Sequence, residues 1–452
     1  MGVAFLPPGV FSIDGRSMIA VAESLAAGGG LSVPPALGRP GPDGLFYSRW
    51  YPLLSLLAVP LVALGRALAG TLGVPPHFAA AVAALVLSVA LAAAATWYVA
   101  RLAERLGAGP REALLAALAY ALGTPALVHA RTFYADPLLA LLTVAALYHS
   151  AGPAAAERRA VVVASGLAVL AKPSGVLVGA ALSAAALVHR RWRAAWPPIA
   201  AAVIGVLVYL AYNQLRFGNP RTFGHDWEFD LTAVPIDVAG LLVSPGQGIV
   251  WFAPPVMLGV ALLPAVFRHD RRTGLAITLY ALGTVALYAA WPRWYLGASG
   301  PRFLLPALPG LVAASGLVGR RARRLLIALT LLGFVANAPS LLVFGERYYT
   351  EAEARGRTVD RLLWTVDEWP VIEMWRTAWR TVVEARGTDV RALMREAGVA
   401  HDGPARPFRV VAIWWWMLPA LGLPRWPGAA LSAAALGAAG FLVARALKAD
   451  AV

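Results

Sequence analysis

The sequence predicts an all-α, polytopic transmembrane protein with about 10 to 12 membrane segments and further short helices along one interface. Of its 452 residues, 59% are hydrophobic and only 14% are charged, and the mean hydropathy is +0.65. Soluble domains have roughly 45 to 50% apolar and about 25% charged residues. A soluble core could not hide this much apolar surface, whereas roughly 20 apolar residues cross the hydrocarbon once as a helix.

The formal net charge of +15 raises the question of nucleic-acid binding, but the arginines gather in short loops between apolar runs. This is the pattern of the positive-inside rule, so we predict that the clusters mark the cytoplasmic side and that no nucleic acid is bound. The clusters are Arg101, Arg105 and Arg111; Arg158 and Arg159; Arg190, Arg191 and Arg193; Arg268, Arg271 and Arg272; and Arg320, Arg321, Arg323 and Arg324. The chain has no cysteine, which excludes disulfides, thiol catalysis and zinc–thiolate sites.

Between successive clusters the chain must cross the membrane an even number of times. The apolar runs fit this requirement in pairs: 112–128 with 137–151, 195–215 with 249–267, and 275–291 with 303–319. The turns near 129–136, 216–248 and 292–302 are therefore expected on the outer side, with the loop that precedes the strong span at about 77–100.

The segment 160–188 also lies between two basic clusters, but Lys172-Pro-Ser-Gly175 interrupts it. Each apolar arm of about 12 residues reaches only about 18 Å as a helix. We therefore predict a hairpin with Lys172 at its apex, in the outer part of the membrane, where a buried cation faces a cavity or an anion. The alternative is one helix kinked at Pro173 with Lys172 snorkelling, which would break the even number of crossings.

The first outer loop is expected over residues 12–76, within a transmembrane domain of residues 1–344. Residues 1–13 are apolar but too short to cross and contain Pro7-Pro8, so either an upstream start or a partial first helix would have to deliver this loop. Residues 52–70 are expected to lie along the outer interface.

Residues 345–409 hold 11 acidic residues and 11 arginines, which predicts a solvated outer loop that is partly helical. Residues 410–452 form the C-terminal membrane part. Either Trp414-Trp-Trp416 lies at the outer interface and 427–444 is a single span, which we favour, or both apolar runs cross.

Two acidic residues on the outer side precede predicted helices. Asp14 comes just before an amphipathic stretch at 16–27, and Asp136 comes just before Pro137. Each could be a helix N-cap, although Ser12 could serve that purpose in place of Asp14. The functional interpretation gains weight because Arg49, Arg131 and the Lys172 apex are expected on the same side.

Arg302 follows Pro301 at the start of a predicted helix. A cation there opposes both the helix dipole and the charge rule, so we expect it to bind an anion. Arg216 is interpreted as an interfacial anchor. The seven histidines show no metal-ligand spacing, and Ser244-Pro-Gly-Gln-Gly248 lacks the context of a nucleotide-binding P-loop.

Several short motifs resemble landmarks of the polyprenyl-phosphate-dependent glycosyltransferases of the GT-C superfamily, whose members include aminoarabinose transferase and the protein O-mannosyltransferases. The motifs are Ile13-Asp14-Gly15, Gly44-Leu-Phe-Tyr-Ser-Arg-Trp-Tyr-Pro52, Tyr212-Asn with Phe217-Gly-Asn-Pro220, Leu242-Val-Ser-Pro-Gly-Gln-Gly248 and Gly300-Pro-Arg-Phe-Leu-Leu-Pro306. The resemblance covers about residues 11–320. It implies a membrane enzyme whose first outer loop carries the catalytic acid, here Asp14, and whose second carries another acidic residue, here Asp136. The short first helix and the part after residue 345 depart from the family.

The expected reaction transfers a sugar from a polyprenyl-phosphate-linked donor to a glycan, lipid or protein acceptor on the outer face of the cell membrane. Cations would stabilise the phosphate that leaves, and a carboxylate would accept the proton of the incoming hydroxyl. Asp14 is the expected base, and Asp136 would orient a substrate or help hold a divalent cation, Mg²⁺ or Mn²⁺, if one is used. The other candidates are Arg49, Lys172 and Arg302 for the donor phosphate, and Tyr47, Arg131 and Tyr134 for substrate binding.

Two other functions fit parts of the pattern. A transporter or flippase of lipid-linked sugars would also need buried cations, but it should have two related halves with matched broken helices, and only one such break is present. An O-antigen ligase or polymerase would place its key arginines in a large late outer loop, whereas those of 345–409 are balanced one for one by acids.

Overall fold

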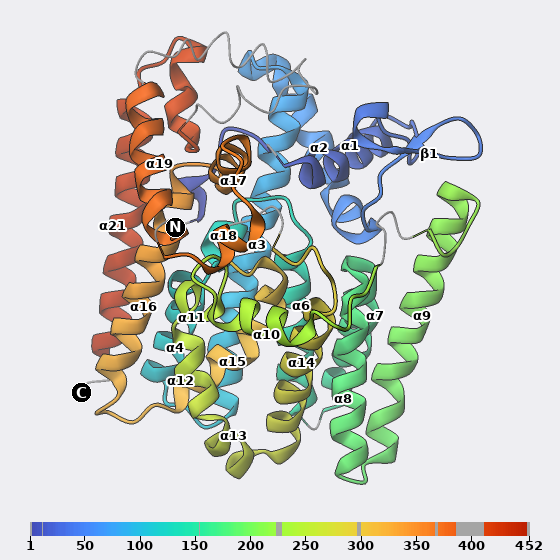
Figure 1. Cartoon of the computed structure of the whole chain (residues 1–452), viewed down its shortest axis with the longest axis vertical. Coiled ribbons are helices and arrows are strands. Elements are labelled where there is room, and N and C mark those ends of the chain that lie inside the picture. The colour runs from blue at the N-terminus through green and yellow to red at the C-terminus, as the bar shows by residue number, and fades with distance from the viewer. Residues whose placement is uncertain are drawn as a thin grey trace.

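Long helices run between two ends of the molecule, with short helices and loops gathered at one of them (Figure 1). The computed structural model describes residues 2–449 except 11, 153, 223–227, 296–299, 367–368 and 386–410. The helices up to the middle of the chain are α1 (Ile13–Ala26), α2 (Pro52–Leu72), α3 (Pro76–Arg105), α4 (Pro110–Gly123), α5 (Ala126–His129), α6 (Asp136–Ser150), α7 (Ala155–Ala171), α8 (Val176–Val188) and α9 (Trp192–Phe217). Those that follow are α10 (Val234–Val243), α11 (Ile249–Phe252), α12 (Pro255–Ala261), α13 (Leu263–His269), α14 (Arg271–Ala289), α15 (Leu308–Ala314), α16 (Arg323–Asn337), α17 (Gly345–Ala354), α18 (Val359–Trp364), α19 (Pro370–Glu384) and α21 (Trp426–Ala449).

The predicted all-α membrane fold is confirmed. Within the described residues, strand structure is limited to the two-residue strands β1 (Arg39–Pro40) and β2 (Phe46–Tyr47), which pair antiparallel in the first loop. Five of the described helices are long and apolar enough to cross a membrane, judged by length and composition: α2, α3, α9, α16 with its extension to Leu341, and α21. Shorter helices, among them α4, α6 and α15, pack against α3 through small buried side chains such as Ala103, Ala116 and Ala146.

The basic turns meet at one end, as the charge pattern predicts. Arg105 at the end of α3 pairs with Glu157 of α7 at 2.7 Å, and the His269 ring lies 3.2 Å from the Arg105 carbonyl oxygen. Arg323 of α16 pairs with Glu112 of α4. The turns between these helices lie at the lower end of Figure 1, which we call the basic end.

The hairpin predicted at 160–188 is confirmed. α7 and α8 are joined at Lys172 and the short 3-10 helix η3 (Pro173–Gly175). Their far ends return together, because Arg158 and Arg191 line the same cavity at the basic end. Lys172 therefore lies at the opposite end of the bundle, and its side chain is buried.

The prediction for residues 52–70 differs from the structure. They lie in α2, which is one of the five helices with the length and composition of a span. It packs against α3 so closely that a Cβ added at Gly65 would lie 2.6 Å from the Ala79 carbonyl oxygen. The prediction gave weight to Arg66, whose charge is offset by Glu23 of α1 at 3.7 Å.

The C-terminal part follows the favoured of the two predicted arrangements. The tryptophan run lies in a 3-10 helix, η9 (Trp414–Leu421), and α21 alone has the character of a span. The first residues of the chain form a 3-10 helix, η1 (Gly2–Phe5), beside α21 and α3. The Ser432 hydroxyl of α21 donates to the Ala4 carbonyl at 3.2 Å.

The segment after residue 345 is more than the solvated loop that was predicted. Arg347 of α17 is buried and pairs with Glu351 at 2.7 Å and with Glu384 of α19 at 2.8 Å. α18 is tied to the loop after α10 by the N–H of Gly246, which donates to the Leu363 carbonyl at 3.1 Å. Part of the charge balance thus reflects packing between α17 and α19; residues 386–409 lie outside the described residues.

Candidate functional site

Asp14 is not the cap of its helix. The N-cap of α1 is Ser12, whose hydroxyl accepts from the N–H of Gly15 at 3.2 Å. This leaves the Asp14 carboxylate, in the first turn, free to point away from the helix axis. Gly15 lets the helix start approach the second loop, because a Cβ there would lie 2.5 Å from Val10 and 3.2 Å from the Phe133 carbonyl oxygen.

Asp136 is not a cap either. The N-cap position of α6 is Ala135, and Asp136 is the first helical residue, followed by Pro137. Its buried carboxylate accepts from the Lys172 ammonium group, with 2.7 Å between Oδ1 and Nζ. Of the two explanations open for each aspartate, the structure therefore favours a role in a charged cluster.

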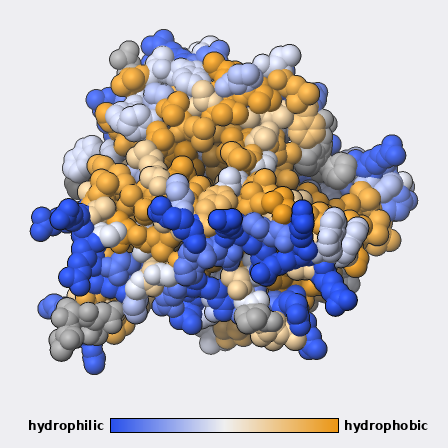
Figure 2. All heavy atoms as spheres, turned by 90° about the horizontal axis from the view of Figure 1, so that it is seen from below, coloured by the Kyte–Doolittle hydropathy of each residue, from blue (hydrophilic) through white to orange (hydrophobic). Residues whose placement is uncertain are grey.

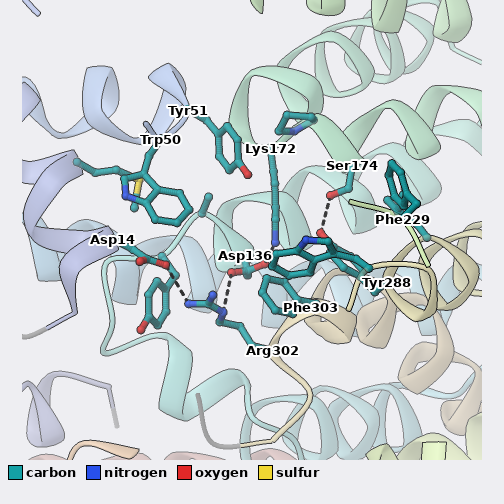
Figure 3. Close-up of a pocket in the computed structure, with 16 residues that line it drawn as sticks. Asp14, Trp50, Tyr51, Asp136, Lys172, Ser174, Phe229, Tyr288, Arg302 and Phe303 are labelled. Carbon is teal, nitrogen blue, oxygen red and sulfur yellow. Dashed lines mark hydrogen bonds and ion pairs between the residues drawn. The ribbon is translucent and has the colours of Figure 1, made fainter. Parts of the chain in front are cut away.

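Four charged side chains from distant parts of the sequence form one chain of ion pairs (Figure 3). Arg302 Nη1 lies 3.3 Å from Asp14 Oδ2, and Arg302 Nε lies 3.9 Å from Asp136 Oδ2. Lys172 completes the chain at 2.7 Å from Asp136. We call Asp14, Arg302, Asp136 and Lys172 the charged cluster; it carries two positive and two negative charges.

Aromatic rings enclose the charged cluster. Lys172 Nζ lies 4.4 Å from the centroid of Phe303, and Arg302 Cζ lies 4.2 Å from that of Tyr134. Tyr288 stacks on Phe303 with 4.9 Å between ring centroids and donates to Ser174 at 3.0 Å. These rings hold the two cations by cation–π contacts in a region of little water, where electrostatic interactions are stronger than in bulk solvent.

The cluster lines a cavity whose other walls are apolar. Its volume is about 80 Å³, and Trp50, Tyr51, Phe229, Leu287 and Trp291 contribute to the lining. Figure 3 shows Asp14, Arg302 and Asp136 facing one another beneath Trp50 and Tyr51. A polar group with an apolar tail fits such a site, because charged and apolar surfaces adjoin within it.

Burial raises the pKa of Asp14, which lies in α1 and outside the five candidate spans. The neighbouring Arg302 acts in the opposite direction, while the charge of Asp136 adds to the rise. A carboxylate with a raised pKa is a stronger base than an ordinary aspartate, so Asp14 is suited to accept a proton.

Two of the predicted substrate residues are engaged elsewhere. The guanidinium of Arg131 donates to three backbone carbonyls, those of Phe5, Ser340 at 2.8 Å, and Ala412. Tyr47 donates to Asp43 and lies in the small strand pair. Neither lines the cavity with the charged cluster, and these contacts explain both residues without a substrate.

Arg49 lies beside the site without lining the cavity. Its guanidinium carbon is 6.0 Å from the Trp50 ring centroid, and its charge is the smallest of the influences on the pKa of Asp14. Of the eight predicted residues, the structure thus brings together Asp14, Asp136, Lys172, Arg302 and Tyr134, which are all in the cavity lining.

Arg216 has a different role from the interfacial anchor that was predicted. It is almost fully buried, and its guanidinium donates to the backbone carbonyls of Ser48 and, at 3.2 Å, Trp50, and to Asn213 Oδ1 at 2.7 Å. It therefore fixes the loop that carries Trp50 and Tyr51 into the cavity. The sequence offered one indication of this role, because Asn213 and Arg216 lie three positions apart in the same motif.

The cavity also contains residues that the sequence did not single out for the site, namely Trp50, Tyr51, Ser174, Phe229, Tyr288, Trp291 and Phe303. Trp50, Tyr51 and Ser174 lie within two positions of the candidates Arg49 and Lys172, so proximity in sequence could have indicated them. Tyr288 and Trp291 lie at the end of an apolar run, where ordinary interfacial aromatics also occur.

The donor set offers little to a divalent cation. In the part of the chain that the structure describes, no group of three His, Asp or Glu side chains is placed to hold a metal. The two carboxylates of the charged cluster already have Lys172 and Arg302 as counter-ions. A divalent ion would have to compete with two fixed cations for the same oxygens.

No protein-family model and no curated protein matches the sequence. Among solved structures, ArnT from Cupriavidus metallidurans in the apo state is similar to the chain, with a TM-score of 0.53 and 16% identity over 95% of this chain and 74% of that one. The same protein bound to undecaprenyl phosphate gives a TM-score of 0.52 at the same identity and coverage. The Archaeoglobus fulgidus oligosaccharyltransferase in the apo form gives 0.46, with 14% identity over 78% of this chain and 55% of that one. The likeness to the two ArnT structures shows that the chain shares their overall fold.

Proposed function

We propose that the protein is a membrane glycosyltransferase that transfers a sugar from a polyprenyl-phosphate-linked donor to an acceptor at the end of the bundle opposite the basic turns. The observation that carries this proposal is the charged cluster in a cavity with apolar and aromatic walls. We propose that this end faces outward, because the positive-inside rule predicts that the basic turns are cytoplasmic. The likeness in fold to ArnT supports the proposal, and one of the similar ArnT structures is bound to undecaprenyl phosphate.

The cations of the cluster suit a departing phosphate. As the bond between the anomeric carbon and the phosphate oxygen breaks, the bonding electrons stay on that oxygen and the phosphate gains negative charge. Arg302 and Lys172 are positioned beside one another through Asp136, so their donors can stabilise that charge without rearranging. The planar guanidinium of Arg302 can bind two phosphate oxygens at once.

Asp14 suits the other half of the reaction. The acceptor hydroxyl forms a bond to the anomeric carbon and must lose its proton, which a carboxylate within hydrogen-bond reach can accept. Asp14 is paired with Arg302 at 3.3 Å, whereas Asp136 is paired with both Lys172, at 2.7 Å, and Arg302, at 3.9 Å. We assign base catalysis to Asp14 and the positioning of both cations to Asp136.

The apolar part of the cavity supports a lipid-linked donor. Phe229, Leu287, Trp291 and Phe303 line it next to the cations, so a prenyl chain could leave the phosphate along an apolar surface. The two aspartates are already neutralised by protein cations, so we further propose that transfer needs no divalent metal.

The test uses the purified full-length protein with a panel of polyprenyl-phosphate sugars, and it measures the release of polyprenyl phosphate. Asp14→Asn should lower the rate by about 10² to 10⁴-fold, which is the usual contribution of a general base. Asp43→Asn is the matched control, because Asp43 is an exposed acid of the same loop. A chelator should leave the wild-type rate unchanged.

The proposal fails if Asp14→Asn retains the full rate while its folding is intact. It also fails if the wild-type protein consumes no donor of the panel but moves lipid-linked sugars between the leaflets of a vesicle, which would identify a flippase.

A further inference from the structure

A second cavity, with four arginines around it, lies at the basic end of the bundle. It measures about 290 Å³ and lies between the α6–α7 turn, the α8–α9 turn and the start of α14. Arg158, Arg191, Arg193 and Arg272 line it together with His149. Figure 2 views the molecule from this end, where hydrophilic side chains gather in a broad band. We call this space the basic cavity.

The arginines of the basic cavity have no protein counter-ion in direct contact. Across the described ranges, none of the four forms an ion pair with a carboxylate, while their neighbours at the same end do. The acids beside the cavity are engaged elsewhere. Glu157 accepts from Arg105 at 2.7 Å and from a backbone N–H at 3.0 Å, and Asp270 caps α14 and accepts from the Thr273 hydroxyl at 2.6 Å.

The like charges lie close enough to repel one another. Arg191 acts on Arg272 as a neighbouring positive charge, although the two residues come from different turns of the chain, and the negative charge of Asp270 opposes this effect only in part. Arg272 is half-buried, whereas Arg158, Arg191 and Arg193 are exposed at the mouth. Gathering cations in this way is unfavourable unless an anion lies between them.

The walls behind the arginines are apolar. Val161, Leu182, Ala186, Pro197 and Pro198 come from α7, α8 and α9, of which α9 has the character of a membrane span. The cavity therefore opens where the end of a membrane helix meets the headgroup layer. A basic pocket between membrane helices on the positively charged side is the kind of site that binds the headgroups of anionic lipids.

We propose that the basic cavity binds the headgroup of an anionic phospholipid carrying two phosphates, drawn from the leaflet at the basic end. Four guanidinium groups can bind two phosphates in pairs of hydrogen bonds. The adjoining apolar walls favour a lipid over a freely diffusing anion, because the acyl chains start next to the phosphates. This proposal is independent of the reaction at the charged cluster.

The test measures binding of diphosphatidylglycerol to the full-length protein by native mass spectrometry, with phosphatidylcholine as the reference lipid. The cavity variant carries Arg158→Gln, Arg191→Gln and Arg272→Gln. The matched control carries Arg320→Gln, Arg321→Gln and Arg324→Gln, which removes the same charge from exposed residues at the same end. With about 1 kcal/mol, or about fivefold, for each arginine that contacts the bound headgroup, we expect about 100-fold weaker binding in the cavity variant. The control variant should bind like the wild type, because its three arginines do not line the cavity.

Equal weakening in both triple variants would overturn the proposal, because general surface charge would then explain the binding. Competition by inorganic phosphate or by the deacylated headgroup as strong as that by the lipid would also overturn it and would indicate a site for a soluble anion. If the triple cavity variant does not fold, the single variant Arg158→Gln at the exposed mouth takes its place. About fivefold weaker binding is expected there, and unchanged binding would refute the proposal.

Discussion

Asp136 holds two cations in place, and removing its charge should destabilise the protein. The Asp136 side chain is 5% exposed, the Lys172 side chain 9% and the Arg302 side chain 10%. Asp136→Asn would leave Lys172 buried without the carboxylate that lies 2.7 Å away. Removing one partner of such a buried pair costs about 3 to 5 kcal/mol, because the remaining charge is uncompensated.

A double-mutant cycle separates this effect from an ordinary loss of contacts. Adding Lys172→Met to Asp136→Asn removes the stranded charge, and replacing a buried ion pair by apolar groups is often neutral. We therefore expect the double variant to regain most of the stability that the single variant loses. Its sugar transfer should stay low, because the donor phosphate has still lost a cation.

The assay follows the apparent Tm of the purified proteins in one detergent, with Asp43→Asn as an exposed control. A loss of 3 kcal/mol corresponds to a fall of no more than about 10 °C in a chain of this size. The reasoning is refuted if Asp136→Asn keeps the wild-type Tm. The reasoning is equally refuted if the loss of stability in the double variant equals the sum of the losses in the single variants Asp136→Asn and Lys172→Met. The two charges would then not be coupled.

Two further predictions concern residues at and beside the site. Burial raises the pKa of Asp14 above its ordinary value of 3.8, and the base must be deprotonated to act. The transfer rate should therefore fall as the pH drops through that raised pKa. A pH–rate profile that falls only at or below pH 3.8 would contradict this. Arg131→Met should lower the apparent Tm, because hydrogen bonds to a charged group contribute about 1.5 to 3 kcal/mol each, while KM for the lipid-linked donor stays close to that of the wild type. A large rise in KM without a change in Tm would indicate that Arg131 binds the substrate after all.

The end of the bundle at which each candidate lies could be predicted from the sequence. Between successive basic turns the chain crosses an even number of times, which assigns Asp136, Lys172 and Arg302 to the end opposite those turns. The strong span at about 77–100 assigns the loop with Asp14 to the same end. The structure places these four together. This prediction succeeded because it depends on the order of charges along the chain and not on side-chain packing.

Which residues at that end meet one another could not be predicted. Arg131 and Asp136 are only five positions apart. Arg131 nevertheless donates to backbone carbonyls, whereas Asp136 lines the cavity. Arg216 was assigned to the interface, because the sequence does not show that the carbonyls of the first loop would converge on it. Such contacts depend on loop conformation, which apolar periodicity does not determine.

The helix caps show how a single local bond decides between two interpretations of one residue. An aspartate at a helix start is explained by capping alone, and in the sequence Asp14 had that explanation available. Because Ser12 supplies the cap at 3.2 Å, α1 would keep its first turn without Asp14, and the carboxylate is left to Arg302. Ser12 caps the helix, and Asp14 pairs with Arg302. A change at Asp14 therefore acts on the charged cluster and not on the start of the helix.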